Sequence, residues 1–211
     1  MSKSLTIHHQ DTLESHPDVR LPDQHQDTLS KTTLGFWIYL MTDSLLFATL
    51  FATYAVLHNE TFGGPTSRDL FSLSTAFAET MILLLSSVTC GLGMLCALQN
   101  KKNQLIAYLA LSFLLGTCFV AIELTEFTQL FQEGNSWEKS AFLSSFFTLV
   151  GTHGIHVSFG LLWMVVMMAQ VFWKGVSVTI FRRLITFSLF WHFLDLIWIF
   201  IFTFVYLMGV I

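Results

Sequence analysis

The chain has 211 residues, of which 54% are hydrophobic, 15% aromatic and only 11% charged. In a soluble domain of this size about a quarter of the residues are charged, so the composition excludes an ordinary soluble globular protein. The net charge of -4 is uninformative, because the charges lie in the N-terminal segment and between apolar blocks. No glycine-rich phosphate loop and no basic stretch suited to nucleic acid is present, so we expect no nucleic-acid partner.

Residues 1–33 are polar and precede the first apolar block, so we expect them to form a flexible cytoplasmic tail. No secretory cleavage pattern is present, and the first apolar block is too long for a signal-peptide core. The segment contains four histidines at irregular spacing, which favours a solvated tail over a metal site: His8, His9, His16 and His25.

Five long apolar blocks follow, over residues 34–57, 70–98, 104–127, 141–172 and 184–210. A helix needs about 20 apolar residues to cross a hydrocarbon core of about 30 Å. The sequence therefore predicts an all-α integral membrane bundle of five transmembrane helices over residues 34–211. All three prolines lie outside the blocks, so we expect continuous helices, unlike the broken helices of secondary transporters.

Lysine and arginine determine the expected orientation, because cytoplasmic loops are enriched in them. With the N-terminus in the cytoplasm, the outer segments contain only Arg68 and Lys139. The inner segments then contain eight cations: Lys3, Arg20, Lys31, Lys101, Lys102, Lys174, Arg182 and Arg183. The sequence thus predicts a cytoplasmic N-terminus and, because the number of spans is odd, a C-terminus on the outer (periplasmic) side.

Eight ionisable groups fall within the predicted spans, where such groups are costly and mark a function or a polar network. They are Asp43, Glu79, Glu123, Glu126, His153, His156, His192 and Asp195. None of the predicted spans contains lysine or arginine, so the acids must be protonated, hydrogen-bonded to other polar side chains, or paired with another chain. We expect buried polar contacts with a structural or lipid-associated role, and neither catalytic, cofactor-binding nor metal-binding residues.

Six of these residues form three pairs spaced i, i+3 along a helix, and this spacing places both residues of a pair on one helix face. They are Glu123 with Glu126, His153 with His156, and His192 with Asp195. The last pair is compatible with a histidine that a carboxylate orients behind a metal, and also with a packing network. The spacing fits neither the His-Glu-x-x-His zinc motif nor the Glu-x-x-His motif of di-iron bundles. Haem ligation by one of these histidines stays an alternative.

Small residues spaced four apart predict close helix packing. They form the pairs Ser86 with Cys90, Ser87 with Gly91, and Gly154 with Ser158. Trp191 and Trp198 share a helix face and are interpreted as apolar bulk.

Several stretches resemble subunit III of the haem–copper oxidases, and within that family the five-helix form of the bo-type ubiquinol oxidases. The long specific motifs are Leu149-Val150-Gly151-Thr152-His153-Gly154-x-His156-Val157 and Trp191-His192-Phe193-Leu194-Asp195-x-x-Trp198. The stretch from Gly35 to Asp43 also matches, with Asp43 where many cytochrome c oxidase relatives have glutamate, which favours the quinol branch. The resemblance extends from about Leu34 to the C-terminus.

This resemblance implies a non-catalytic, multi-pass subunit of a proton-pumping ubiquinol oxidase in the bacterial inner membrane, where it serves aerobic respiration. It implies that haem and copper belong to the large subunit I and that this chain has no cofactor. It further implies partners in subunits I, II and IV and in membrane phospholipids, with a role in assembly and stability. The alternatives are a cytochrome c oxidase subunit III, a stand-alone membrane enzyme with a metal or haem, and a transporter.

Overall fold

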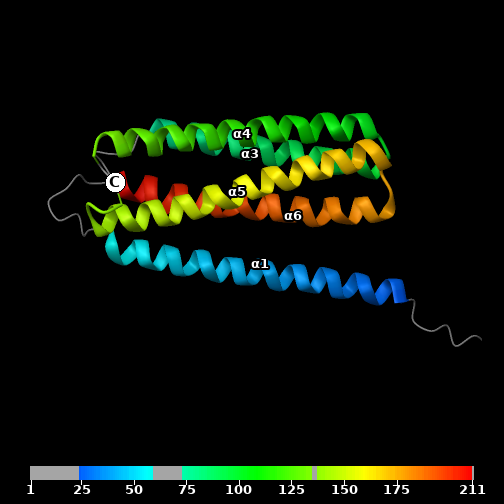
Figure 1. The fold of residues 1–211 in the computed structure, drawn as a ribbon, viewed down its shortest axis with the longest axis horizontal. Coiled ribbons are helices and arrows are strands. Elements are labelled where there is room, and N and C mark those ends of the chain that lie inside the picture. Colours follow the sequence, from blue (N-terminus) through cyan, green and yellow to red (C-terminus); the bar gives the residue numbers. More distant parts are fainter. Residues whose placement is uncertain (1–23, 59–72, 135–136, 211) are drawn as a thin grey trace, which may run out of the picture. The chain divides into compact units, whose positions relative to one another are not determined.

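The computed structural model describes residues 24–58, 73–134 and 137–210, in which every regular element is a helix (Figure 1). A first long helix is followed by four more long helices, and the fifth continues into a π-helix and a short final helical turn. The elements are α1 (Gln24–Leu57), α3 (Leu73–Leu98), α4 (Lys102–Gln132), α5 (Ala141–Lys174), α6 (Val178–Ile201), η1 (Phe202–Leu207) and α7 (Met208–Val210).

Five of the described helical segments are long and apolar enough to cross a membrane, as the sequence predicts. They are Thr33–Leu57, Leu73–Leu98, Lys102–Gln132, Ala141–Lys174 and Val178–Leu207. Residues 1–33 are predicted to form a flexible polar tail, and residues 1–23 lie outside the described residues. The part of this segment from Gln24 onward differs from the prediction, because it belongs to the helix α1.

The connection between α5 and α6 is shorter than the sequence predicts, because α6 begins at Val178 and not near residue 184. Gly175 ends α5 with a positive φ of 70°, a conformation that glycine adopts at no steric cost. The Ser177 hydroxyl then caps α6 by accepting a hydrogen bond from the Ile180 N–H at 3.3 Å. Arg182 and Arg183 therefore lie within α6, and Arg183 donates a hydrogen bond to Gln170.

The fold divides into two units, residues 1–37 and 38–211, and the second contains the helix bundle. In this second unit α3 packs against α4, α4 against α5, α5 against α6, and α6 against α3. Short connections join α3 to α4 and α5 to α6, so neighbouring helices are antiparallel (Figure 1). The arrangement is an up-and-down four-helix bundle.

Within this second unit, α1 packs on the outside of the four-helix bundle through one narrow stripe. Its buried residues are Leu40, Asp43, Phe47 and Tyr54, which lie on one face at helical spacing. The Phe47 ring lies 5.3 Å from the His156 ring on α5, measured between centroids. Most of the remaining side chains of this part of α1 are exposed.

Trp191 of α6 is held between two glycines on neighbouring helices. A Cβ atom added to Gly160 on α5 would lie 2.9 Å from the indole, and one added to Gly116 on α4 would lie 3.0 Å from it. The indole N–H donates a hydrogen bond to the Ser86 hydroxyl of α3 at 3.2 Å. The Trp191 ring thus contacts all three other helices of the bundle. Its role is more specific than the sequence indicates, where it is interpreted only as apolar bulk.

The last span is one continuous helical segment, as predicted, but within it the α-helix passes into the π-helix η1, although no proline lies there. A π-turn inserts an extra residue into the helical repeat. Two consecutive residues, Val205 and Tyr206, are both buried in this segment. The Tyr206 ring lies 6.1 Å from Trp198 and 6.3 Å from Phe146, so the turn directs a phenol into the bundle.

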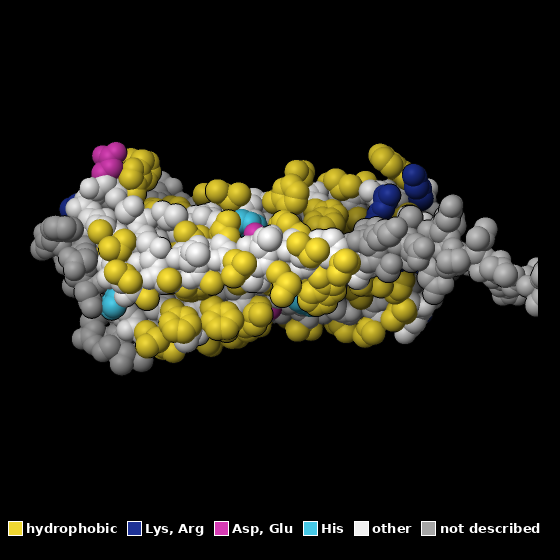
Figure 2. All heavy atoms as spheres, turned by 90° about the horizontal axis from the view of Figure 1, so that it is seen from below, with side chains coloured by type: hydrophobic (Ala, Val, Ile, Leu, Met, Phe, Trp, Pro, Cys, Tyr) yellow, Lys and Arg dark blue, Asp and Glu magenta, His cyan; other side chains and the backbone are white. Residues whose placement is uncertain are grey.

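Hydrophobic side chains extend along the described surface, and most of the lysine and arginine atoms in view lie toward one end (Figure 2). That end contains the α3–α4 and α5–α6 connections. Five of the described cations belong to these connections and the adjoining turns: Lys101, Lys102, Lys174, Arg182 and Arg183. The Lys102 ammonium donates a hydrogen bond to the Phe172 carbonyl at 2.8 Å, across this same end.

Candidate functional site

The eight predicted ionisable residues are all described, and the structure distributes them over four places in the bundle. Asp43 meets His156, His192 and Asp195 meet a serine of α3, and the three glutamates gather between α3 and α4. His153 is separate, enclosed by aromatic rings. His153 and His156 therefore have separate partners, whereas His192 and Asp195 share one.

Asp43 and His156 join α1 to α5. The His156 Nε2 atom lies 3.2 Å from the Asp43 Oδ1 atom, and His156 Nδ1 lies 2.7 Å from the Thr152 carbonyl. Because a carbonyl oxygen only accepts, Nδ1 carries a hydrogen. The Nε2–Oδ1 contact therefore needs one further proton, shared by the imidazole and the carboxyl.

We predict that Asp43→Ala lowers the free energy of unfolding by about 1–3 kcal/mol, because it leaves His156 Nε2 without a buried partner. Titration with a denaturing detergent measures this, and a double-mutant cycle with His156→Phe isolates the coupling between the two residues. Ser44→Ala is the matched control, since the Ser44 hydroxyl bonds only the Leu40 carbonyl of its own helix. Equal effects of Asp43→Ala and Ser44→Ala would contradict the pairing.

His153 lies at the centre of the bundle and is fully buried. Its ring stacks on Trp198 at a centroid distance of 5.3 Å and has edge contacts with Phe119 at 6.0 Å and Phe47 at 6.3 Å. Neither ring nitrogen has a hydrogen-bond partner among the described residues. The imidazole is thus packed as a flat aromatic group.

His192 and Asp195 of α6 both approach Ser87 of α3. The Ser87 hydroxyl lies 2.5 Å from His192 Nδ1, and the Asp195 carboxyl is beside the same hydroxyl. Both side chains therefore join α6 to α3 at this serine. Asp195 is buried and His192 is exposed.

Glu79 of α3 meets Glu123 and Glu126 of α4. One carboxylate oxygen of each residue lies within 4.8 Å of one from each of the other two. Glu79 and Glu123 are 0% and 4% exposed, and none of their four oxygens has a hydrogen-bond partner among the described residues. Glu126 is half-buried. The cluster therefore concentrates three acids without a protein donor for the two buried ones.

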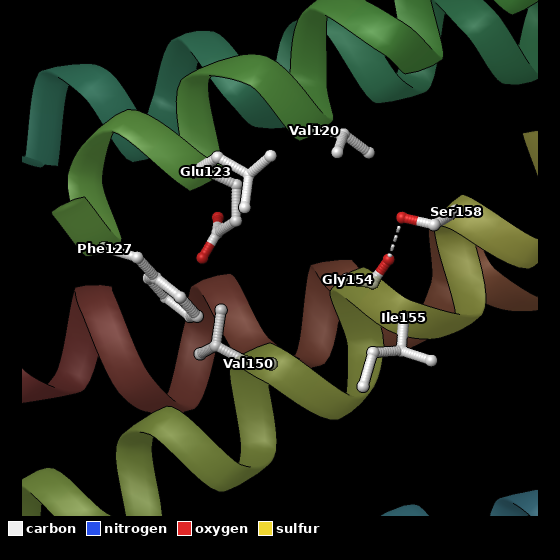
Figure 3. Close-up of a pocket in the computed structure, with 9 residues that line it drawn as sticks. Val120, Glu123, Phe127, Val150, Gly154, Ile155 and Ser158 are labelled. Atoms are coloured by element: carbon white, nitrogen blue, oxygen red, sulfur yellow. Dashed lines mark hydrogen bonds between the residues drawn. The ribbon is translucent and has the colours of Figure 1, made fainter. Parts of the chain in front are cut away.

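A groove of about 310 Å³ lies beside this cluster, between α4 and α5 (Figure 3). The Glu123 side chain extends from α4 into it, near Phe127 and Val150. On α5 the groove is lined by Gly154 and Ser158, whose hydroxyl donates to the Gly154 carbonyl at 2.8 Å. The remaining lining residues are Val120, Leu124, Gly151 and Ile155.

The small-residue pairs predicted from the sequence include one whose glycine is open. A Cβ atom added to Gly154 would meet nothing within 4 Å, because Gly154 lines the groove. The closest approaches among the described glycines, at 2.9 Å, are instead those of Gly116 and Gly160. Sequence reasoning missed both, although their helix-spanning partner Trp191 was singled out.

The family model described as cytochrome c oxidase subunit III matches residues 18–210. The chain is 54% identical over 187 residues to the cytochrome bo(3) ubiquinol oxidase subunit 3 of Pseudomonas aeruginosa, which covers 89% of this chain and 90% of that protein. It is 51% identical to the protein of that name in Pseudomonas putida, and the match covers 88% of this chain and 89% of that protein. It is also 44% identical to the cytochrome c oxidase subunit 3 of Bacillus sp. PS3, covering 84% and 86%.

The five-helix membrane bundle and these matches define the chain as a multi-pass subunit of a membrane-bound oxidoreductase in the bacterial inner membrane. More specifically, it belongs to the subunit III family of the haem–copper oxidases.

Proposed function

We propose that this chain is subunit III of a proton-pumping ubiquinol oxidase, and that it contains no redox centre or catalytic residue of its own. The relatives of highest identity given above are named as ubiquinol oxidase subunits, at 54% and 51%. Haem and copper in the large subunit would carry electrons from quinol to O2, which is reduced to water. The role of this chain is to support the assembly and stability of that large subunit.

The observation that carries the non-catalytic part is the packing of the histidines. The three membrane histidines are separated, and each one contacts a side chain of another helix. His156 bonds Asp43 and His192 contacts Ser87, while the His153 ring is covered by Trp198, Phe119 and Phe47. A porphyrin beside His153 would need the space that these rings fill.

The exposed apolar surface supports a role in association with other subunits. Within the second unit, α1 buries only a stripe that begins at Leu40, and outward-facing residues such as Met41, Leu45 and Val56 are mostly exposed. These side chains suit lipid tails or the apolar helices of other subunits. We assign them to contacts with oxidase subunits I, II and IV and with membrane phospholipids.

The distribution of cations supports a cytoplasmic N-terminus. Five lysines and arginines gather at the end of the bundle that contains the α3–α4 and α5–α6 connections. At the opposite end the described residues include Lys139 near the start of α5. Cytoplasmic ends carry the excess of positive charge, so the cation-rich end faces the cytoplasm and the C-terminus the periplasm.

A donor assay tests the choice of ubiquinol over cytochrome c. The oxidase complex is purified through a tag on this chain, and O2 uptake is measured with a short-chain ubiquinol and with reduced cytochrome c. We expect rapid uptake with ubiquinol and none with cytochrome c. Uptake with cytochrome c alone would establish the alternative, a cytochrome c oxidase subunit III.

Replacement of His153 by leucine tests whether this histidine has only a packing role. We predict unchanged haem and copper content and an unchanged or raised unfolding temperature, because the substitution removes a buried polar group without a partner. Optical spectra, metal analysis and thermal unfolding of the complex measure these quantities. A loss of haem in the assembled His153→Leu complex would show that His153 is a ligand.

A further inference from the structure

The glutamates of the membrane bundle form an arrangement that packing does not explain. Glu123 and Glu126 follow one another on α4 at a spacing of three residues, and Glu79 approaches them from α3. Glu79 is fully buried and directs a carboxylate without a hydrogen-bond partner at this pair. Neither Glu79 nor Glu123 has an ion pair with a cationic side chain among the described residues.

Ionised carboxylates in an apolar interior are costly, so each of these acids either takes up a proton or has a counter-charge beside it. Where helices need only to pack, serine or threonine suffices, as Ser86 and Ser112 show when they bond each other between α3 and α4. Three acids from two helices, with their oxygens gathered within 4.8 Å, instead match the donor set of a hard cation.

We propose that Glu79, Glu123 and Glu126 bind one divalent cation of the size of Ca²⁺. Ca²⁺ takes oxygen ligands at about 2.3–2.6 Å, so two oxygens on opposite sides of the ion lie about 5 Å apart. One oxygen of each glutamate lies within 4.8 Å of the other two, which is inside this span. Mg²⁺ is usually held by one or two carboxylates and keeps several waters, so a site of three carboxylates suits Ca²⁺ better.

The three carboxylates themselves supply most of a coordination sphere. They offer up to six oxygens, and Ca²⁺ takes about six to eight. The groove beside Glu123 is apolar apart from Glu123 and the Ser158 hydroxyl, so a water ligand would have to lie next to the Glu123 carboxylate. Glu126 is half-buried, so one side of the cluster is accessible. A bound ion would clamp α3 to α4.

The test is equilibrium Ca²⁺ binding to the purified oxidase complex in mild detergent, after removal of bound metal with a chelator and at high sodium concentration. Tb³⁺ serves as a luminescent substitute for Ca²⁺, because Trp198 and Tyr206 lie close together and Tyr206 is within electrostatic range of all three glutamates. The complexes compared carry Glu79→Gln, Glu123→Gln or Glu126→Gln. Controls are Glu133→Gln, an exposed acid just beyond α4, and Asp43→Asn, a buried acid elsewhere.

We expect one saturable site that prefers Ca²⁺ to Mg²⁺ and raises the unfolding temperature when occupied. Glu79→Gln and Glu123→Gln should weaken binding about tenfold or more, with a smaller loss for Glu126→Gln and none for the two controls. If a buried variant fails to assemble, Glu126→Gln and Glu123→Asp decide the matter by their affinity. Unchanged Ca²⁺ and Tb³⁺ binding in every assembled glutamate variant, or an equal loss in Glu133→Gln, would overturn the proposal.

Discussion

Replacing Trp198 by alanine should lower the free energy of unfolding by about 3–5 kcal/mol, the largest effect of a single substitution that we expect in this chain. The indole is 0% exposed and has an edge-to-face contact with Phe119 at 4.6 Å. It also stacks on His153, and its N–H donates to the Thr80 hydroxyl at 3.1 Å. Removal of the ring leaves a cavity at the centre of the bundle and a buried hydroxyl that has lost a donor.

Denaturing-detergent titration of the purified protein measures this effect, and Trp173→Ala is the matched control. Trp173 lies near the end of α5 and is 79% exposed, so its replacement should change the free energy of unfolding by less than about 0.5 kcal/mol. Comparable losses in both variants would mean that Trp198 does not have the central packing role described here.

The second large effect is expected for Gly160→Val. The Cβ atom alone would lie 2.9 Å from the Trp191 ring and 3.3 Å from Phe190, and the indole has Gly116 against its other edge. Because the ring has no free side to move into, α5 and α6 must separate. Overpacking of this kind costs about 1–3 kcal/mol or more, and the Trp191 hydrogen bond to Ser86 would lengthen.

Gly154→Val on the same helix provides a matched control, since nothing lies within 4 Å of its added Cβ. We expect near-normal yield and stability for Gly154→Val and poor yield with a lowered unfolding temperature for Gly160→Val. Both glycines are in α5, so helix propensity contributes equally to the two results. Equal stability of the two variants would contradict the close approach of Trp191.

The membrane helices follow from the sequence because their apolar blocks are long and the membrane thickness sets their length. The start of a helix is harder to predict where the charged residues indicate one boundary and the capping residue another. Arg182 and Arg183 suggested a connection, yet Ser177 caps α6 five residues earlier. Long cationic side chains tolerate a place in the first turns of a membrane helix because they extend to the interface.

The identities of the ionisable residues were predictable, but most of their partners were not. Spacing along one helix paired His153 with His156 and His192 with Asp195, whereas their main contacts come from other helices. Asp43 meets His156 across 113 positions of sequence, a contact that periodicity alone does not encode.

The position of the glutamate cluster can be predicted from the sequence if α3 and α4 are considered together and not one helix at a time. The α3–α4 connection is short and the two helices are antiparallel, so residues equally far from it face each other. Glu79 precedes Asn100 by 21 residues, and Glu123 follows Lys101 by 22. The π-helix that directs Tyr206 inward has no comparable signal, because no proline or glycine marks it.

Purification of the tagged full-length chain from native membranes in mild detergent, followed by an optical spectrum and a metal count, tests the central claim most directly. We predict that larger membrane subunits containing haem and copper co-purify with the chain. Once separated from them, the chain should have no Soret band and no iron or copper. A chain that purifies alone with its own haem, or with stoichiometric iron or copper, would contradict its assignment as a non-catalytic oxidase subunit.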